Sequence, residues 1–347
     1  MRPFTMPCLM LAAAALAAQA QDLHAVPLPG SRKDDLALPL IASTANPAAA
    51  ARLNAYLQLV YLEGLAKPGM KDPFAHVRYD FHREDGAAVT GSTSALSWKA
   101  ANQGRLLAIQ ITSETMGAYP TEAVDDLLLD GIHGQPVTAS DLFTVEGLKA
   151  LRTRLAGMRK AKLRQVIQSE KQGKPGEDAQ ACLEAQEESL KEQAFDGIQD
   201  LRLDAKTLAF PASLDLPHAM MVCDVDLTLS LPRQELAPYL SAYGEALLDP
   251  SLPAPALPAA WAHRVFMGQI GTAQVALHLL REQDGSIGGS YAYLKRGAAI
   301  DLSGKAEDGA YALDESDADG NTTGHLAFRQ EGLQLKGEWT SPDGKRS

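Results

Sequence analysis

The best candidates for acid–base or metal chemistry lie in the sequence DFHREDG. Asp80, His82 and Glu84 alternate along the chain, so a strand would place their side chains on one face. Convergent carboxylates and imidazoles act as general acids and bases or as metal ligands. The pair Asp85-Gly86 that follows is typical of a turn. We therefore interpret the cluster as a solvated strand face that leads into a turn.

The segment DADGN is a second candidate, because Asp317, Asp319 and Asn321 alternate like the first ligands of a calcium-binding loop. Such a loop needs Gly at its sixth position and Glu at its twelfth. This chain has Thr322 and Phe328 there. A hairpin turn explains the residues better, and we expect no metal.

His133 follows Gly131-Ile132 and precedes Gly134, which favours a turn residue over a catalytic base. The sequence contains no Gly-x-Ser-x-Gly elbow, no phosphate-binding loop, no His-Glu-x-x-His helix and no Cys-x-x-Cys pair. We therefore expect a binding protein rather than an enzyme, with no cofactor and no catalytic residues.

Residues 1–20 have the features of a signal peptide. Arg2 supplies a positive start, residues 9–18 are apolar, and the sequence AQA at 18–20 fits the small-x-small cleavage pattern. The apolar run is shorter than the roughly 20 residues that a membrane span needs. The sequence predicts a periplasmic or secreted protein with no transmembrane segment, its mature form beginning near Gln21.

Cysteine placement fits export. Cys8 precedes the apolar run, so it is misplaced for lipid attachment, and Cys182 and Cys223 remain in the mature chain. In an oxidising compartment a single pair favours a disulfide over the alternative of two buried thiols.

The charge balance restricts the partners. The chain has 32 basic and 43 acidic residues, for a net charge of −11. Nucleic acids and anionic lipids need a basic surface, so neither is expected as a ligand. A cationic protein partner is compatible with this balance.

Four prolines in residues 249–260 predict an extended linker. It separates an α+β domain at 22–248 from an all-β domain at 261–347. In the first domain, helices are expected at 46–66, 144–171, 178–194 and 233–246, and strands at 75–83, 95–98, 106–112, 123–130, 207–210 and 220–230. The helix at 144–171 has a basic face and the next helix is acidic, which favours a mutually screening helical hairpin.

Glycines recur in the C-terminal domain at intervals of 11 or 12 residues, and most of them follow Asp or Glu. They are Gly285, Gly297, Gly309, Gly320, Gly332 and Gly344. Hairpin turns separated by alternating strands predict an antiparallel meander that curls into a barrel or half-barrel. Tyr291 and Tyr293 share one strand face, either as a contact surface or, as alternation favours, inside the barrel.

Three short motifs carry a family resemblance: Met-Gly-Ala-Tyr-Pro at 116–120, Val-Asp-Asp-Leu-Leu-Leu-Asp-Gly at 124–131 and Ser-Asp-Leu-Phe at 140–143. Together they resemble the extracytoplasmic domain shared by the lysozyme-sensing anti-sigma factor RsiV and the peptidoglycan deacetylase PdaC. The resemblance covers about residues 36–248. It implies an α+β module that meets cell-wall material or the enzymes that cut it, with Gly117, Ala118 and Tyr119 as a candidate contact surface.

This chain departs from the family in two ways. Tyr119 stands where the family has histidine, and the metal-dependent catalytic domain of the deacetylase has no counterpart. We expect an exported protein that recognises or inhibits a lysozyme-like enzyme, including an immunity protein against a wall-degrading toxin. A peptidoglycan- or carbohydrate-binding envelope protein is the alternative, and an orphan hydrolase comes third.

The printed sequence stops soon after the turn signal Asp343-Gly344. This predicts an open sheet edge that a partner, or a second copy in a homodimer, could cover.

Overall fold

The structure, a computed structural model, is an α+β fold, as predicted. It describes residues 22–32, 35–67, 69–78, 92–117, 119–172, 177–191, 195, 198, 200–214, 216–282, 284–317, 320–331 and 334–346. Two compact units are present, one from Met1–Val137 with Ala246–Ser347 and one from Thr138–Glu245. We call them unit 1 and unit 2.

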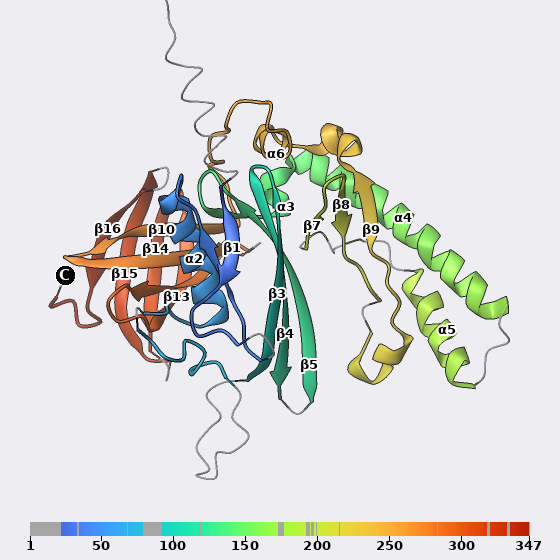
Figure 1. Cartoon of the computed structure of the whole chain (residues 1–347), viewed down its shortest axis with the longest axis horizontal. Helices are drawn as coiled ribbons and strands as arrows, with labels where there is room; N and C mark the ends of the chain where they lie inside the picture. Colours follow the sequence, from blue (N-terminus) through green and yellow to red (C-terminus); the bar gives the residue numbers. More distant parts are fainter. Residues whose placement is uncertain are drawn as a thin grey trace, which may run out of the picture. The chain divides into compact units, whose positions relative to one another are not determined.

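The largest sheet of unit 1 is a seven-stranded antiparallel meander in which each strand pairs with its chain neighbours. Its strands are β10 (His263–Ile270), β11 (Ala273–Arg281), β12 (Ser286–Tyr293), β13 (Ala299–Glu307), β14 (Ala310–Ser316), β15 (Thr322–Glu331) and β16 (Gln334–Thr340). It curls into a nearly closed barrel (Figure 1). Glycines 285, 297, 309 and 320 have positive φ angles between consecutive strands, so the predicted turns and meander are confirmed.

The second sheet of unit 1 has the order β3-β4-β5-β6. Its strands are β3 (Thr93–Gln103), β4 (Leu106–Met116), β5 (Pro120–Asp130) and β6 (Gln135–Val137). The strands expected at 95–98, 106–112 and 123–130 are therefore present but longer. Of the strand expected at 75–83, only residues 75–78 are described, as a turn and one isolated bridge at Arg78.

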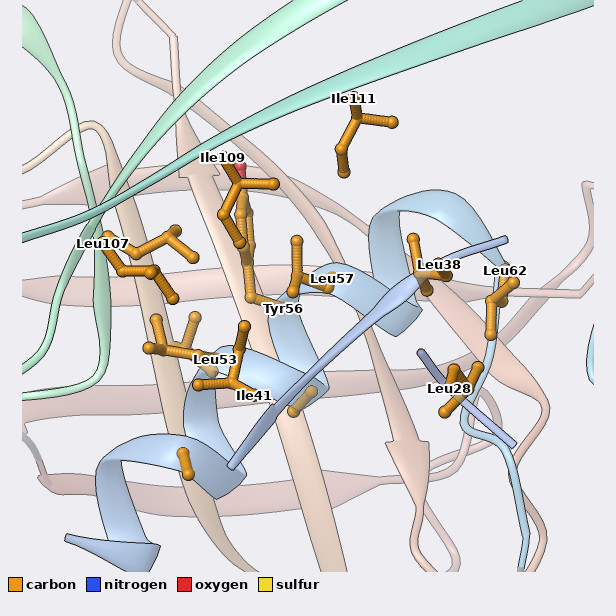
Figure 2. Close-up of a cluster of buried hydrophobic side chains, with 14 of the residues drawn as sticks. Leu28, Leu38, Ile41, Leu53, Tyr56, Leu57, Leu62, Leu107, Ile109 and Ile111 are labelled. Carbon is orange, nitrogen blue, oxygen red and sulfur yellow. The ribbon is translucent and has the colours of Figure 1, made fainter. Parts of the chain in front are cut away.

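Helix α2 (Pro47–Tyr61) packs between these two sheets and the small sheet of β1 (His24–Pro27) and β2 (Pro39–Ala42). Asn46 caps the helix by accepting a hydrogen bond from the backbone N–H of Ala49. Figure 2 shows the core it forms, with Leu53 and Leu57 facing side chains of β4 such as Ile109. Val265 and Ala276 belong to the same cluster, so α2 also covers the outer face of β10 and β11.

The expected domain boundary at 249–260 does not coincide with the division into compact units, because those residues belong to unit 1. The buried guanidinium of Arg105 holds the segment. Its Nη1 and Nη2 donate to the carbonyl oxygens of residues 246, 250, 252 and 253 at 2.5–3.2 Å. Farther along, Arg264 donates to the Pro258 carbonyl. The proline-rich segment is therefore anchored to unit 1.

Unit 2 contains α3 (Ala139–Leu142), α4 (Val145–Gln172), α5 (Glu177–Ser189), a 3₁₀ helix η1 (His218–Cys223), a second 3₁₀ helix η2 (Arg233–Tyr239), and the sheet β7 (Arg202–Leu203), β8 (Thr207–Phe210) and β9 (Leu229–Pro232). Leu163 and Ile167 of α4 pack on Leu183 of α5 and on Leu214 and Leu227. Lys171 and Glu187 form an ion pair between α4 and α5, as a screening hairpin requires.

Two expected elements of this region are wrong. Residues 220–230 are not one strand, because the chain first forms η1 and only enters β9 at Leu229. Residues 233–246 are not one helix. Pro238 lies inside η2, Leu240 is extended, and α6 (Ala242–Leu248) starts afterwards, since proline cannot donate to a continuing helix.

Cys182 of α5 and Cys223 of η1 form a disulfide, as predicted, with an S–S distance of 2.05 Å and a sequence separation of 41 residues. Closing a loop of this length restricts the unfolded chain and typically stabilises a protein by about 3–4 kcal/mol. We expect the double substitution Cys182→Ser with Cys223→Ser to lower the stability of unit 2 by this amount in urea unfolding. The same loss should follow reduction of the wild type, and an unchanged unfolding midpoint in both would contradict the expectation.

Candidate functional site

The residues that the family resemblance singles out lie at the tip of the hairpin β4–β5. Gly117 and Tyr119 follow Met116, the last residue of β4, and precede Pro120, the first of β5. Tyr119 is 69% exposed, the highest value among the tyrosine, phenylalanine and tryptophan residues of the described chain. Ala118 lies outside the described residues.

The strands behind this tip carry an unfavourable pair of charges. The register places Glu114 of β4 directly opposite Glu122 of β5. Like charges at directly opposite positions destabilise a strand pair. The first five residues of β5 are exposed, and Val124 adds a 41% exposed apolar side chain. Tyr119, Glu114, Glu122 and Val124, which we call the hairpin tip, therefore combine an exposed aromatic ring with two carboxylates at directly opposite positions.

Tyr291 and Tyr293 do not form a surface. Tyr291 is only 2% exposed and belongs to the barrel core, and the two rings make an edge-to-face contact with centroids 5.5 Å apart. Alternation along β12 turns both side chains toward the interior. The interpretation that favoured the barrel interior agrees with this placement.

A buried carboxylate, which the sequence analysis missed, organises that interior. Glu315 accepts hydrogen bonds from the Tyr291 hydroxyl and the Trp339 indole N–H, both at 2.8 Å, and from the Thr323 hydroxyl at 2.7 Å. Gly324 leaves room for this arrangement, since a Cβ there would lie 2.3 Å from the indole nitrogen. Burial and the bond to Glu315 raise the pKa of Tyr291, so its phenol remains a donor.

The barrel interior opens into a pocket of about 940 Å³ between β10 and β16. Most of its walls are apolar or aromatic, with polar side chains at the rim. The lining includes Phe266, Leu277, Tyr291, Phe328, Leu335 and Trp339. This size and lining are typical of pockets that take a ligand or a set of apolar side chains.

A second buried polar pair, also missed, lies where α2 covers the barrel. His263 Nδ1 and His278 Nε2 are 3.1 Å apart, and Tyr56 contacts the His278 ring edge-on with centroids 5.1 Å apart. Burial lowers the pKa of His278 to about 3, with a further contribution from His263, and burial also lowers the pKa of His263. No sequence pattern indicated this contact, because His263 and His278 lie on different strands and form no motif.

The histidine pair makes unit 1 sensitive to acid. Below the unfolded value near pH 6.5 the unfolded histidines bind protons while His278 stays neutral in the folded state until about pH 3. Stability should therefore fall as the pH drops through this window, by about 1.4 kcal/mol per pH unit for each histidine kept neutral. We expect His278→Phe to flatten this dependence in urea unfolding at pH 7, 6, 5 and 4. An equal slope in both proteins would contradict the assignment.

His133 lies in a structural turn. Its Nδ1 is 2.6 Å from the buried Asp130 carboxylate, and its backbone carbonyl accepts a hydrogen bond from Arg52. Asn46 donates to the carbonyls of Gly131 and Ile132, which ties the turn to the start of α2. Within the described residues, no hydroxyl or thiol bonds to the His133 ring.

Most of the candidate metal residues lie outside the described part of the chain. Asn321 donates from its backbone N–H to Asp317 at 2.8 Å, as in a turn, while Asp319 lies outside the described residues. The cluster Asp80, His82, Glu84 and Asp85 also lies outside them. Across the described part of the chain, no group of three His, Cys, Asp or Glu residues is placed to hold a metal ion.

Among the described helices, none has both the length and the apolar character needed to cross a bilayer. No family model matches this chain, and no curated protein sequence matches it.

Proposed function

We propose that this chain is an exported binding protein that recognises, and thereby inhibits, a cationic peptidoglycan-cleaving enzyme through the hairpin tip. The main supporting observation is that the exposed Tyr119 lies at the turn of a hairpin whose strands carry two carboxylates at directly opposite positions. Tyrosine is a common anchor at interfaces because it buries a large amphipathic area. The leader-like residues 1–20, the disulfide and the resemblance to the lysozyme-sensing domain support export and this class of partner.

The opposed carboxylates have a consequence for binding. Glu114 and Glu122 repel each other in the free protein, and a cationic group from the partner would relieve that repulsion. A positively charged partner therefore gains affinity here that a neutral one does not. The acidic net charge of the chain would also speed the encounter.

Binding of the mature protein to immobilised lysozyme-type enzymes tests this proposal. We expect Tyr119→Ala to weaken binding at least tenfold. Glu122→Gln should weaken binding as well, yet stabilise the protein slightly, because it removes the repulsion. The matched control is Glu307→Gln, an exposed carboxylate on β13 with Ala310 opposite, which should leave the affinity unchanged.

Equal loss of binding in Glu122→Gln and Glu307→Gln, with no loss in Tyr119→Ala, would contradict a hairpin-tip site, because it would show a long-range charge effect only. The alternatives of carbohydrate binding and hydrolysis have weaker support. The Glu315 oxygens in the barrel already accept hydrogen bonds from protein donors, and no hydroxyl or thiol among the described residues bonds to the His133 ring.

A further inference from the structure

The barrel has seven strands, and the pocket described above lies between its two edge strands, in a space that we call the gap. β10 and β16 end the sheet and do not pair with each other. Each strand is antiparallel to its neighbours, so the first and the seventh run in the same direction. Direct closure would have to be a parallel pair, which β10 and β16 do not form. One more strand, antiparallel to both, would complete an even-numbered up-and-down barrel.

The backbone of β10 presents free hydrogen-bonding groups to this gap. The Ala262 carbonyl accepts from the Arg281 N–H, so even-numbered residues bond toward β11. The odd-numbered residues then face the gap, and among them are Met267 and Gln269. In the described part of the chain, no hydrogen bond from outside the β10–β11 ladder reaches the backbone of these two residues.

The backbone of β16 presents the same kind of edge. The Gln330 N–H donates to the Gly309 carbonyl on the β14 side, so Glu331 bonds toward its partner Gln334 on β16. Alternation then turns the backbone groups of Leu335, Gly337 and Trp339 toward the gap. Two strand edges thus flank the pocket described above.

One end of the gap is already filled by a peptide-like group of the protein. The Gln135 side-chain amide accepts from the Val265 N–H at 2.8 Å and donates to the Val265 carbonyl at 2.9 Å. This is the pairing that a strand backbone would make. The lining of the pocket begins at the next residue, Phe266, immediately after the backbone groups of Val265 that the Gln135 amide binds.

The chemistry of the pocket fixes which side chains can enter. Its deep walls are apolar, and the nearby carboxylate of Glu315 is saturated by Tyr291, Trp339 and Thr323. A charged group entering the pocket would lose its hydration with no partner inside. Inward-facing side chains should therefore be uncharged and apolar, while the rim residues Lys336 and Glu338 meet polar ones.

We propose that the gap between β10 and β16 binds an extended peptide segment of a partner protein, apolar at alternate positions, as an eighth strand. Main-chain hydrogen bonds to Met267, Gln269, Leu335 and Gly337 supply affinity, and the pocket selects the inward side chains. This site is separate from the hairpin tip and does not depend on the function proposed for it.

The test uses the mature full chain and a blocked peptide of alternating valine and threonine with a lysine at each end. We expect saturable binding by calorimetry, with slower hydrogen exchange at Met267, Gln269, Leu335 and Gly337. Gln269→Pro removes a gap-facing N–H from an edge strand and should weaken binding at least tenfold. Gln269→Ala, the matched control, keeps that N–H and should bind normally.

A second experiment uses the unchanged protein, so it tests the proposal even if the proline variant misfolds. The same peptide with N-methyl groups on alternate residues cannot donate along one edge, and we expect it to bind at least tenfold more weakly. Equal binding of the methylated peptide would overturn the proposal. So would a concentration-dependent dimer that blocks the gap, or selective binding of a fatty acid in place of the peptide, since these identify a second copy or a lipid as the occupant.

Discussion

Replacing Arg105 with methionine is expected to lower the unfolding free energy of unit 1 by about 3 kcal/mol or more, because several carbonyl oxygens lose their donor. The Arg105 side chain is 2% exposed, and its guanidinium is the shared donor for carbonyl oxygens from Ala246 to Pro253. Methionine fills much of the volume but donates no hydrogen bond. Each buried carbonyl left without a donor costs about 1–3 kcal/mol unless water reaches it.

Urea unfolding with tryptophan fluorescence measures this loss, and two variants serve as controls. Arg105→Lys keeps the charge but not the planar fork, so we expect an intermediate loss. Arg329→Met removes an exposed arginine from β15 and should change stability by less than about 0.5 kcal/mol. A loss of the same small size at Arg105 would show that the proline-rich segment does not depend on this side chain.

Replacing Glu315 with leucine is expected to lower the unfolding free energy of unit 1 by about 3 kcal/mol or more, the second large effect. The change removes the shared acceptor of the Tyr291 hydroxyl, the Trp339 indole and the Thr323 hydroxyl. Thr323 keeps a longer bond to the backbone carbonyl of residue 315 at 3.4 Å, so the phenol and the indole account for most of the loss. Each such buried donor costs about 1–3 kcal/mol. The Trp339 emission spectrum should shift together with the unfolding midpoint, because the indole loses its partner.

Glu315→Gln separates the hydrogen bonds from the shape of the side chain. It keeps one acceptor oxygen and turns an N–H₂ group toward donors, so we expect a smaller but clear loss. Asp314→Asn, one residue away on the exposed face of β14, is the matched control with little expected effect. A Glu315→Leu protein as stable as wild type would mean that water, not the carboxylate, satisfies the three donors.

Local signals in the sequence predicted the elements that depend on local physics. Asn46-Pro47 marked the start of α2, the glycine intervals marked the turns of the meander, and the charge pattern marked the α4–α5 hairpin. The disulfide followed from export and a single cysteine pair. Each of these features could be predicted from a few neighbouring residues or, for the disulfide, from the number of cysteines in the mature chain.

Features that depend on distant contacts were not predictable from local patterns. The proline-rich residues looked like a linker, yet Arg105, some 140 residues earlier in the chain, anchors them. The bonds between His263 and His278 and between Glu315 and Trp339 likewise join different strands. An apolar pattern at residues 220–230 favoured a strand, but the turn into η1, beside the disulfide at Cys223, replaced its first half.

The central claim is that the hairpin tip recognises a cationic wall-cleaving enzyme, and a biosensor titration against purified lysozyme-type enzymes tests it most directly. We predict a saturable one-to-one complex of micromolar or tighter affinity with at least one of them, lost in Tyr119→Ala and retained in Glu307→Gln. Absence of binding to every enzyme in the panel, or binding indifferent to Tyr119, would contradict the claim.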